Sequence, residues 1–430
     1  MKHFSYPKYN ENVYFKELDN GLKVYLIPKM DYNKTFVTFT TNYGSFDTSF
    51  IPRGKQRRVN QPAGIAHFLE HKLFAMPDGT DAFEKLSSYG VSANAFTSFD
   101  RTSYLFSGTS NIKEALEYLL DFVQTPYFTP KSVKKEQGII IEEYQMYEDN
   151  PDSKMYYALL ENMYQKHLLN TTVLGTVSSI KKITAHKLYE AYNTFYHPSN
   201  MILTVIGAFD KEEILDVIIK NQNSKSYVKE PPIERFFKKE PKALAIKEKT
   251  LHMGVSMPYV GLGVKLNPSD DLLARYKQEI ALDLVLNMYF SNSGEVYNNL
   301  LKKGIINQTF RFGVMQYNGA LSAILYGMTA RTEEFISEIT KSLVGLKRRT
   351  INIDTFERQK KVMQGAFIRS LNSLENYNIT FTAHVLEGIN MFDVPNIIAS
   401  ITLDDVKAVI KDIKPSNITI LKILPKKDEN

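Results

Sequence analysis

The sequence predicts an α+β protein of two homologous domains, in which the second domain is a degenerate copy of the first. Three observations predict this fold class. The chain has 430 residues, which is too many for a single hydrophobic core. Segments with strand and helix periodicity are mixed along the first half. The helical patterns at 66–74 and 133–143 return at 282–290 and 356–366, which indicates an internal repeat.

The elements of the first half follow from residue periodicity and turn residues. The expected strands are 21–28, 34–43, 92–95, 102–107 and 201–207. The expected helices are 63–74, 81–89, 112–124, 131–147 and 211–222, with two more before residue 201. The helix at 112–124 ends at Thr125-Pro126 and the helix at 131–147 stops at Asn150-Pro151, because a residue before proline is driven out of the helical conformation.

The boundary between the halves is a polar segment. Residues 222–241 contain Pro231-Pro232 and Pro241 and lack a convincing periodic element, which is typical of a linker. We therefore expect a first domain at 1–222, a linker at 223–241 and a second domain at 242–430.

The most informative segment is the pattern His67-x-x-Glu70-His71. Residues four apart lie on one face of a helix, so His67 and His71 can direct imidazole nitrogens at a single Zn²⁺. Glu70 lies at the edge of that face, where a carboxylate can take a proton from a zinc-bound water. This order is the inverse of the common zinc-protease motif. The alternative, two core histidines beside a solvated glutamate, is costly because buried imidazoles need partners.

A third ligand is expected in the helix at 131–147, because catalytic zinc usually has three protein ligands and a water. Glu136 and Glu143 lie seven residues apart on an otherwise apolar face of that helix, nearly two full turns. A carboxylate that faces a core needs a metal, a cation or a hydrogen-bond donor. Pairing with Lys or Arg is the alternative for both glutamates, but the nearby His67 and His71 favour a metal.

Four segments of the first half share their order and spacing with one enzyme family. They are 64–71, 92–98 followed by 102–104, 136–143, and 195–201. With these segments the chain resembles the pitrilysin, insulysin and mitochondrial processing peptidase family of inverzincin zinc peptidases. The likeness is to the short bacterial members, which often occur as pairs of one chain with the zinc motif and one without it. This chain is of the type that keeps the motif.

The resemblance implies roles for the matched residues of the zinc motif and the long helix. His67, His71 and Glu143 match the three zinc ligands, and Glu70 matches the general base. Glu136 matches an acid beside the ligands, which agrees with the tendency of a ligating histidine to give its other N–H to a carboxylate.

The resemblance also implies contacts with substrate. Asn94, Ala95 and Phe96 match sheet-edge residues that pair with the substrate backbone, as in β-strand addition. Periodicity alone favours an ordinary strand there. Arg311 and Tyr317 are the expected counterparts of an arginine and a tyrosine of the second half that help to hold the substrate.

The family architecture implies two α/β-roll domains, each a mixed sheet packed by helices, that face each other across a cavity. Four such domains form a closed chamber, so the chain implies a partner: a second copy or an inactive homologous subunit. The second domain is expected to be non-catalytic, because alignment with the first changes all five site positions. His67, Glu70, His71, Glu136 and Glu143 become Asp283, Leu286, Asn287, Gln359 and Ala366.

Composition is compatible with a cytoplasmic bacterial protein. The chain has no Cys, so no disulfide can form, which fits a reducing compartment. The N-terminus lacks an apolar core of secretory type, and no apolar run approaches a membrane span. The net charge of +6 is mild, and no basic stripe with interleaved aromatics suggests nucleic acid.

The sequence therefore predicts a zinc-dependent endopeptidase with one Zn²⁺ per chain, which cleaves unstructured peptides or leader and presequence segments. The alternatives are a non-catalytic subunit that binds peptides or stabilises a partner, and a metal-binding scaffold without hydrolysis. The intact His67, Glu70, His71 and Glu143 argue against a non-catalytic subunit.

Overall fold

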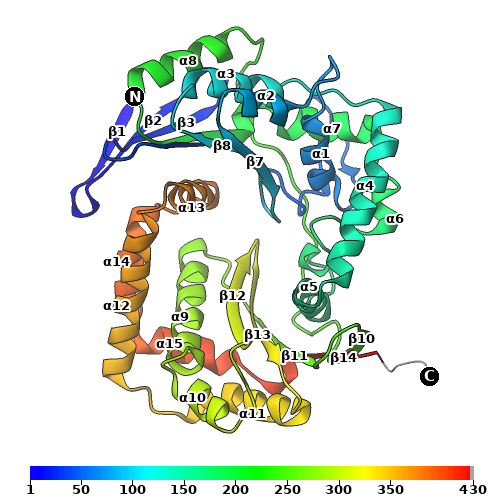
Figure 1. Ribbon diagram of the computed structural model, residues 1–430. Coiled ribbons are helices and arrows are strands. Elements are labelled where there is room, and N and C mark those ends of the chain that lie inside the picture. The colour runs from blue at the N-terminus through cyan, green and yellow to red at the C-terminus, as the bar shows by residue number, and fades with distance from the viewer. Residues whose placement is uncertain (427–430) are drawn as a thin grey trace. The chain divides into compact units, whose positions relative to one another are not determined.

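The computed structural model describes residues 1–426, which form two compact units (Figure 1). Unit 1 comprises Met1–Tyr144, Val173–Phe237 and Ile368–Asp393. Unit 2 comprises Gln145–Thr172, Lys238–Phe367 and the described chain from Val394 onward. Each unit thus takes one segment from the other half of the sequence. The division of the sequence into a first domain at 1–222, a linker at 223–241 and a second domain at 242–430 stays a prediction.

Unit 1 is built on a seven-stranded mixed sheet. Neighbouring strands in this sheet run antiparallel, except that β3 and β9 are parallel. In order across the sheet the strands are β1 (Lys2–Tyr6), β2 (Glu11–Glu17), β3 (Lys23–Pro28), β9 (Met201–Gly207), β4 (Thr35–Thr41), β8 (Thr102–Gly108) and β7 (Ser92–Thr97). Strand β7 is therefore an edge strand. A separate pair joins β5 (Ser49–Phe50) to β6 (Val59–Asn60).

Helices cover both faces of this sheet, and α13 lies on the face opposite α3 and α8 (Figure 1). The helices of unit 1 are α1 (Ile65–Leu73), α2 (Ala82–Ser88), α3 (Ile112–Val123), α4 (Pro130–Asp149, which runs on past the unit boundary), α6 (Val177–Ile180), α7 (Ala185–Phe195), α8 (Lys211–Asn223) and α13 (Leu374–Glu387).

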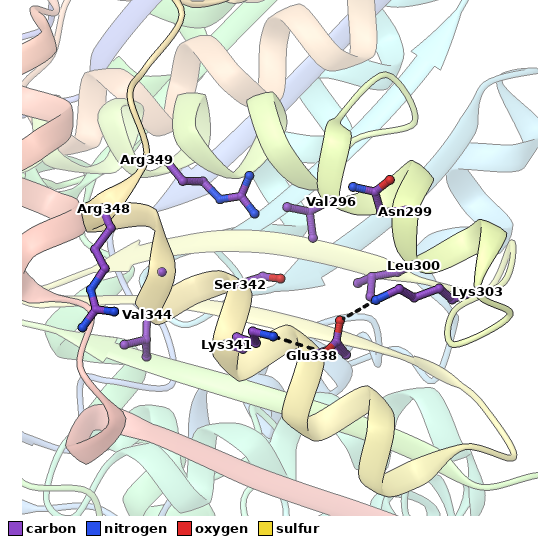
Figure 2. A pocket seen from close by; sticks show the side chains of 11 residues that line it. Val296, Asn299, Leu300, Lys303, Glu338, Lys341, Ser342, Val344, Arg348 and Arg349 are labelled. Atoms are coloured by element: carbon purple, nitrogen blue, oxygen red, sulfur yellow. Dashed lines mark hydrogen bonds and ion pairs between the residues drawn. The ribbon is translucent and has the colours of Figure 1, made fainter.

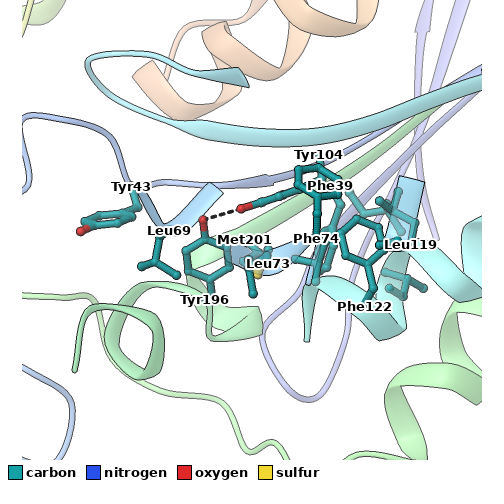
Figure 3. Close-up of a cluster of buried hydrophobic side chains, with 14 of the residues drawn as sticks. Phe39, Tyr43, Leu69, Leu73, Phe74, Tyr104, Leu119, Phe122, Tyr196 and Met201 are labelled. Carbon is teal, nitrogen blue, oxygen red and sulfur yellow. Dashed lines mark hydrogen bonds between the residues drawn. The ribbon is translucent and has the colours of Figure 1, made fainter. Parts of the chain in front are cut away.

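The two faces of the sheet differ in chemistry because successive strand residues point to opposite sides. On one face Phe39 packs with Leu73 and Phe122 in an apolar cluster, where the buried hydroxyls of Tyr104 and Tyr196 are 2.9 Å apart (Figure 3). On the other face the contacts with α13 include hydrogen bonds, from Thr38 to Asn378 and between Thr204 and Thr382, as well as the aromatic contact of Tyr25 with Phe381. Buried threonines there are all hydrogen-bonded, which satisfies the requirement for buried polar groups.

Unit 2 repeats the topology with a five-stranded sheet in which β10 and β14 are parallel. In order across the sheet the strands are β10 (Glu248–Met253), β14 (Ile418–Pro425), β11 (Tyr259–Leu266), β13 (Ala320–Met328) and β12 (Arg311–Tyr317). This order corresponds to β3-β9-β4-β8-β7 of unit 1, strand for strand and with the same parallel pair. The expected α+β fold of two homologous mixed-sheet domains is confirmed.

The helices of unit 2 follow the same sequence of elements. They are α5 (Pro151–Met163), α9 (Leu272–Phe290), α10 (Glu295–Lys302), α11 (Thr332–Gly345), α12 (Ile353–Ser370, whose end belongs to unit 1), α14 (Val394–Ser400) and α15 (Leu403–Asp412). Helix α5 follows α4 and packs on β11 and β14 of unit 2, whereas α13 follows α12 and packs on β4 and β9 of unit 1. The two halves of the chain thus exchange one helix each.

The structure has the expected strands and the five bounded helices of the first half to within a few residues, and it adds the hairpin of β1 and β2. Sequence periodicity missed that hairpin, because β1 is exposed along nearly its whole length and has no buried face to give alternation. Three α-helices, α5, α6 and α7, lie between α4 and β9, where two were expected. None of the helices in residues 1–426 has the length and apolar character needed to cross a bilayer.

Gly64 sets the start of α1 and carries a testable prediction. Its φ of +87° is in the left-handed region, and a Cβ there would lie 2.1 Å from the carbonyl oxygen of Leu174. We expect Gly64→Ala to lower the free energy of unfolding by about 2–5 kcal/mol, because left-handed strain adds to a backbone overlap that cannot relax cheaply. Chemical denaturation measures the change.

Gly79→Ala is the matched control for this substitution. Gly79 has a φ of +85°, but its Cβ position is open. That variant isolates the conformational strain, which is about 1–2 kcal/mol. Equal losses in the two variants would show that the contact with Leu174 does not constrain α1.

Candidate metal centre

Helix α1 holds two histidines and a glutamate, of which His67 and Glu70 are buried and His71 is half-buried. Phe68, Leu69 and Leu73 are completely buried and fix one side of the helix in the core. His67 and Glu70 are each only 8% exposed. Since imidazole and carboxylate groups are seldom buried without partners, their position requires an explanation in the surrounding elements.

Helix α4 supplies the partners. It begins after Thr129, whose hydroxyl accepts from the backbone N–H of Ser132 and satisfies one of the free donors at the helix start. Val133 and Ile140 are buried and orient the helix, so that Glu136 and Glu143 face α1. The two expected carboxylates therefore reach the histidines, and the exposed Glu142 does not.

His67, His71 and Glu143 form a cluster whose ligand atoms all lie within 4.8 Å of one another. Nε2 of His67 is 3.6 Å from Oε1 of Glu143, and Nε2 of His71 is 3.5 Å from Oε2 of Glu143. Zinc bonds of about 2.1 Å in a tetrahedron place ligand atoms about 3.4 Å apart. Oε2 of Glu143 is buried and accepts no hydrogen bond from residues 1–426. A buried carboxylate oxygen of this kind is suited to be a metal ligand. The residues fit Zn²⁺.

A further carboxylate, that of Glu136, contacts His71 of this cluster. Nδ1 of His71 lies 3.2 Å from Oε1 of Glu136, which leaves Nε2 of the same ring for a metal. Oε2 of Glu136 in turn lies 3.7 Å from the ammonium group of Lys72, a side chain that is only 4% exposed. Nδ1 of His67 is buried without a hydrogen bond in the described chain, so only one of the two imidazoles has such support.

The electrostatics of the cluster suit metal binding. Burial, with the charge of His71 as the smaller cause, lowers the pKa of His67 to about 3, so this imidazole is neutral at pH 7. Burial also acts to lower the pKa of His71, but the hydrogen bond with Glu136 and the charges of Glu143 and Glu70 raise it above its ordinary value. A zinc ion would have to displace any proton from His71, because zinc ligands bind in their deprotonated form.

Glu70, the predicted general base, lies on α1 one residue before His71. Burial raises the pKa of its carboxyl group, and a hydrogen bond from Thr97 opposes the rise. The hydroxyl of Thr97 donates to Oε2 of Glu70 over 2.6 Å. A buried carboxylate with a raised pKa beside potential metal ligands is a candidate proton acceptor.

The equivalent positions of unit 2 hold no such cluster. Asp283 and Asn287 stand on α9 where His67 and His71 stand on α1, and the amide of Asn287 donates to the carboxylate of Asp283 over 2.9 Å. Burial raises the pKa of Asp283, and that hydrogen bond opposes the rise. Within residues 1–426, only His67, His71 and Glu143 form a group of three potential metal ligands.

The predicted peptide-binding residues lie on the edge strand β7. Asn94, Ala95 and Phe96 pair in register with Leu105, Tyr104 and Ser103 of β8. The side-chain oxygen of Asn94 accepts from the backbone N–H of Ala95 over 2.9 Å. The end of β7 lies beside α1, as the bond from Thr97 to Glu70 shows. Binding of substrate by these residues stays a prediction.

Arg311 and Tyr317 begin and end the edge strand β12 of unit 2. The guanidinium of Arg311 donates to the backbone oxygens of Gln308 and Phe310 over 2.6 and 2.9 Å. Arg311 also lines a cavity of about 520 Å³ together with Asn287, the counterpart of His71. Contact of Arg311 and Tyr317 with substrate stays a prediction.

A second cavity in unit 2 lies elsewhere. This space of about 590 Å³ lies between α10 and α11. In Figure 2, Lys303 and Lys341 both reach toward Glu338 there. Its basic lining is thus partly neutralised by its own glutamate, and no predicted site residue lines it.

Comparison with known proteins identifies the family. The family model described as Insulinase (Peptidase family M16) matches residues 51–177, and the model described as Peptidase M16 inactive domain matches residues 182–363. The uncharacterized zinc protease YmfH of Bacillus subtilis (strain 168) is 42% identical over 428 residues, which are 99% of this chain and 100% of that relative. The chain belongs to peptidase family M16.

Solved M16 structures agree with this membership. An M16-like peptidase from Alicyclobacillus acidocaldarius superposes with a TM-score of 0.92 at 33% identity and covers 98% of this chain and 100% of its own. The periplasmic protease PqqL from Escherichia coli shares the fold, with a TM-score of 0.74 at 18% identity, over 96% of this chain but only 47% of its own. A solved protein of this fold can therefore be about twice as long as this chain.

The sequence did not predict a role for two residues that contact the centre, Thr97 and Lys72. Thr97 lies within the matched segment 92–98, and Lys72 directly follows His71. A lysine inside an otherwise buried helix is a signal in itself, since Lys is almost never buried unless paired. Their partners, Glu70 and Glu136, are known only from the tertiary structure.

Glu136 carries a prediction about metal affinity. We expect Glu136→Ala to weaken zinc binding about 10- to 100-fold, because the His71 ring loses the acceptor that fixes its orientation. Competition with a chromophoric chelator measures the dissociation constant. Glu136→Gln, which keeps an acceptor, should fall between this variant and the native chain. Unchanged affinity in both variants would show that Glu136 does not support the metal.

Proposed function

We propose that this M16 family member is a zinc-dependent endopeptidase that cleaves unstructured peptides or leader segments. One observation carries the proposal: His67, His71 and Glu143 converge within 4.8 Å beside the buried Glu70. A buried carboxylate with a raised pKa next to potential metal ligands favours a catalytic site over a non-catalytic subunit or a metal scaffold. The relatives with the printed description zinc protease support the same reading.

The chemistry follows from what each side chain can do. His67, His71 and Glu143 would hold a Zn²⁺ ion, which would supply Lewis acidity to a bound water and to the scissile carbonyl. Glu70 takes the proton of the attacking water and later delivers it to the leaving amine. Glu136 holds the imidazole of His71 in the tautomer that leaves Nε2 free.

The edge of β7 is the proposed binding place for the substrate backbone. Asn94, Ala95 and Phe96 present one side of the strand without a sheet neighbour in the described chain. An extended peptide can add there as a further strand, so that main-chain hydrogen bonds give affinity and alternate side chains give selectivity. A peptide must be unfolded to bind in this way, which favours flexible substrates over folded domains.

A partner chain is part of the proposal. A longer solved protein of this fold holds about twice the length of this chain, and the family resemblance implies a chamber of four domains. We propose that this chain forms a homodimer, or a heterodimer with an inactive homologous subunit, and that Arg311 and Tyr317 contribute to substrate binding. We also propose a bacterial cytoplasmic location, and the absence of Cys is compatible with a reducing compartment.

Removal and return of the metal tests the activity. The purified chain is assayed on fluorescent unstructured peptides, alone and with a candidate partner chain, before and after chelation. We expect about one zinc per chain by elemental analysis, loss of cleavage after chelation, and recovery with added Zn²⁺. A folded protein that contains the same peptide sequence should resist. Cleavage that persists in the zinc-free chain would contradict the proposal.

A further inference from the structure

We infer that Thr97 is the positioning residue of Glu70, and that it links the proposed peptide-binding strand β7 to the general base. This inference rests on the proposed function and adds to it a residue for which no role has been assigned. The observation behind it is the short hydrogen bond of 2.6 Å from the Thr97 hydroxyl to Oε2 of Glu70.

The hydroxyl of Thr97 donates its hydrogen bond to Glu70 and not to its neighbour on β8. Thr97 pairs in register with Thr102 of β8, and their hydroxyl oxygens are 3.3 Å apart. Thr102 is completely buried and donates its own proton to the backbone oxygen of Tyr43 over 2.9 Å. Because a hydroxyl has a single proton to give, the proton of Thr97 is left for Glu70, whose carboxylate is the stronger acceptor.

Glu70 depends on this bond for its orientation. Among residues 1–426, Glu70 accepts a side-chain hydrogen bond from Thr97 and from no other donor. With Oε2 held by Thr97, the second carboxylate oxygen stays available to the attacking water. A hydroxyl on the β-branched side chain of threonine is well suited to the task, since the χ1 angle of such a side chain is stiff.

Thr97 contacts Glu70 and belongs to the strand that we propose to bind the substrate. Thr97 ends β7, directly after Phe96 and two residues after Ala95, so that Thr97 and Ala95 point to the same face of the strand. A peptide paired along β7 and the carboxylate of Glu70 are therefore fixed by one strand. We infer that Thr97 sets the distance between the scissile bond and the base.

Thr97→Val and Thr97→Ser separate this role from simple packing. Valine keeps the shape of threonine and removes the hydroxyl, whereas serine keeps the hydroxyl. For Thr97→Val we expect kcat to fall about 10- to 100-fold, the value of a hydrogen bond to a charged group. The KM and the zinc content should stay within twofold of the native chain. Thr97→Ser should recover most of the lost kcat.

Thr109→Val is the matched control, because Thr109 is exposed just after β8, and it should keep native kcat. A crystal structure of zinc-loaded Thr97→Val gives a readout besides activity: the Glu70 carboxylate should turn from its native position. Native kcat in Thr97→Val, an unmoved Glu70, or equal losses in the valine and serine variants would each overturn the inference. A native chain that cleaves no peptide would instead refute the proposed function, and the crystal structure would still decide the role of Thr97.

Discussion

Glu70→Gln is expected to abolish most peptide cleavage and to leave zinc binding intact. Glutamine keeps the shape of the side chain and an acceptor for the Thr97 hydroxyl, but it cannot take a proton from water. General acid–base groups contribute about 100- to 10,000-fold to rate, so kcat should fall by a factor in that range. Steady-state kinetics on an unstructured peptide and elemental analysis of the same sample measure the two quantities together.

Glu142→Gln is the matched control for this substitution. Glu142 is exposed on α4, one residue before Glu143, so its variant has the same chemical change without a place in the centre. It should retain native kcat and zinc. If Glu70→Gln lost zinc together with activity, Glu70 would be a metal ligand and not the base. If Glu70→Gln stayed active, the proton would have to move through another group.

Glu143→Gln is expected to have the largest effect on the metal. The substitution removes the only negative charge among the three proposed ligands and replaces it with a weak amide oxygen. Loss of an outer partner already costs about 10- to 100-fold in metal affinity, so loss of a direct ligand should exceed about 100-fold. Zinc titration against a chelator measures the dissociation constant, and cleavage should fall in parallel at limiting zinc.

A specific result follows for added metal. Because Glu70 and Thr97 remain in place in Glu143→Gln, excess Zn²⁺ should restore part of the activity, whereas it should restore none in Glu70→Gln. Glu142→Gln again serves as the control of equal chemistry. Full zinc occupancy with native kcat in Glu143→Gln would remove this residue from the metal centre and leave two histidines without a third ligand.

The sequence predicted the elements of the first half because their signals are local. A helix period of 3.6 residues places His67 and His71 on one face and produces the apolar stripe of 131–147. The structure has α1 and α4 in these two segments. The repeat was also visible, because the helical pattern survived at 282–290 after the site residues had changed. The exposed strand β1 gave no such signal and was missed.

The approach of α4 to α1 is not a local property. Glu136 lies 65 residues after the histidine that it contacts, and no periodicity states which helix a carboxylate will face. The family resemblance assigned Glu136 and Glu143, and the structure places both within reach of the imidazoles. The bond from Thr97 to Glu70 spans 27 residues and had neither a local signal nor an assigned role.

The sequence by itself determined the two helices, the spacing of the histidines on one face, and the existence of a second, altered copy. Only the tertiary structure decided that Lys72 neutralises Glu136, that Thr97 holds Glu70, and that α5 and α13 each pack on the sheet of the other half. The reason is physical: helix periodicity is set by backbone bonds between residues four apart, whereas the pairing of buried polar groups is set by which surfaces meet when the core is formed.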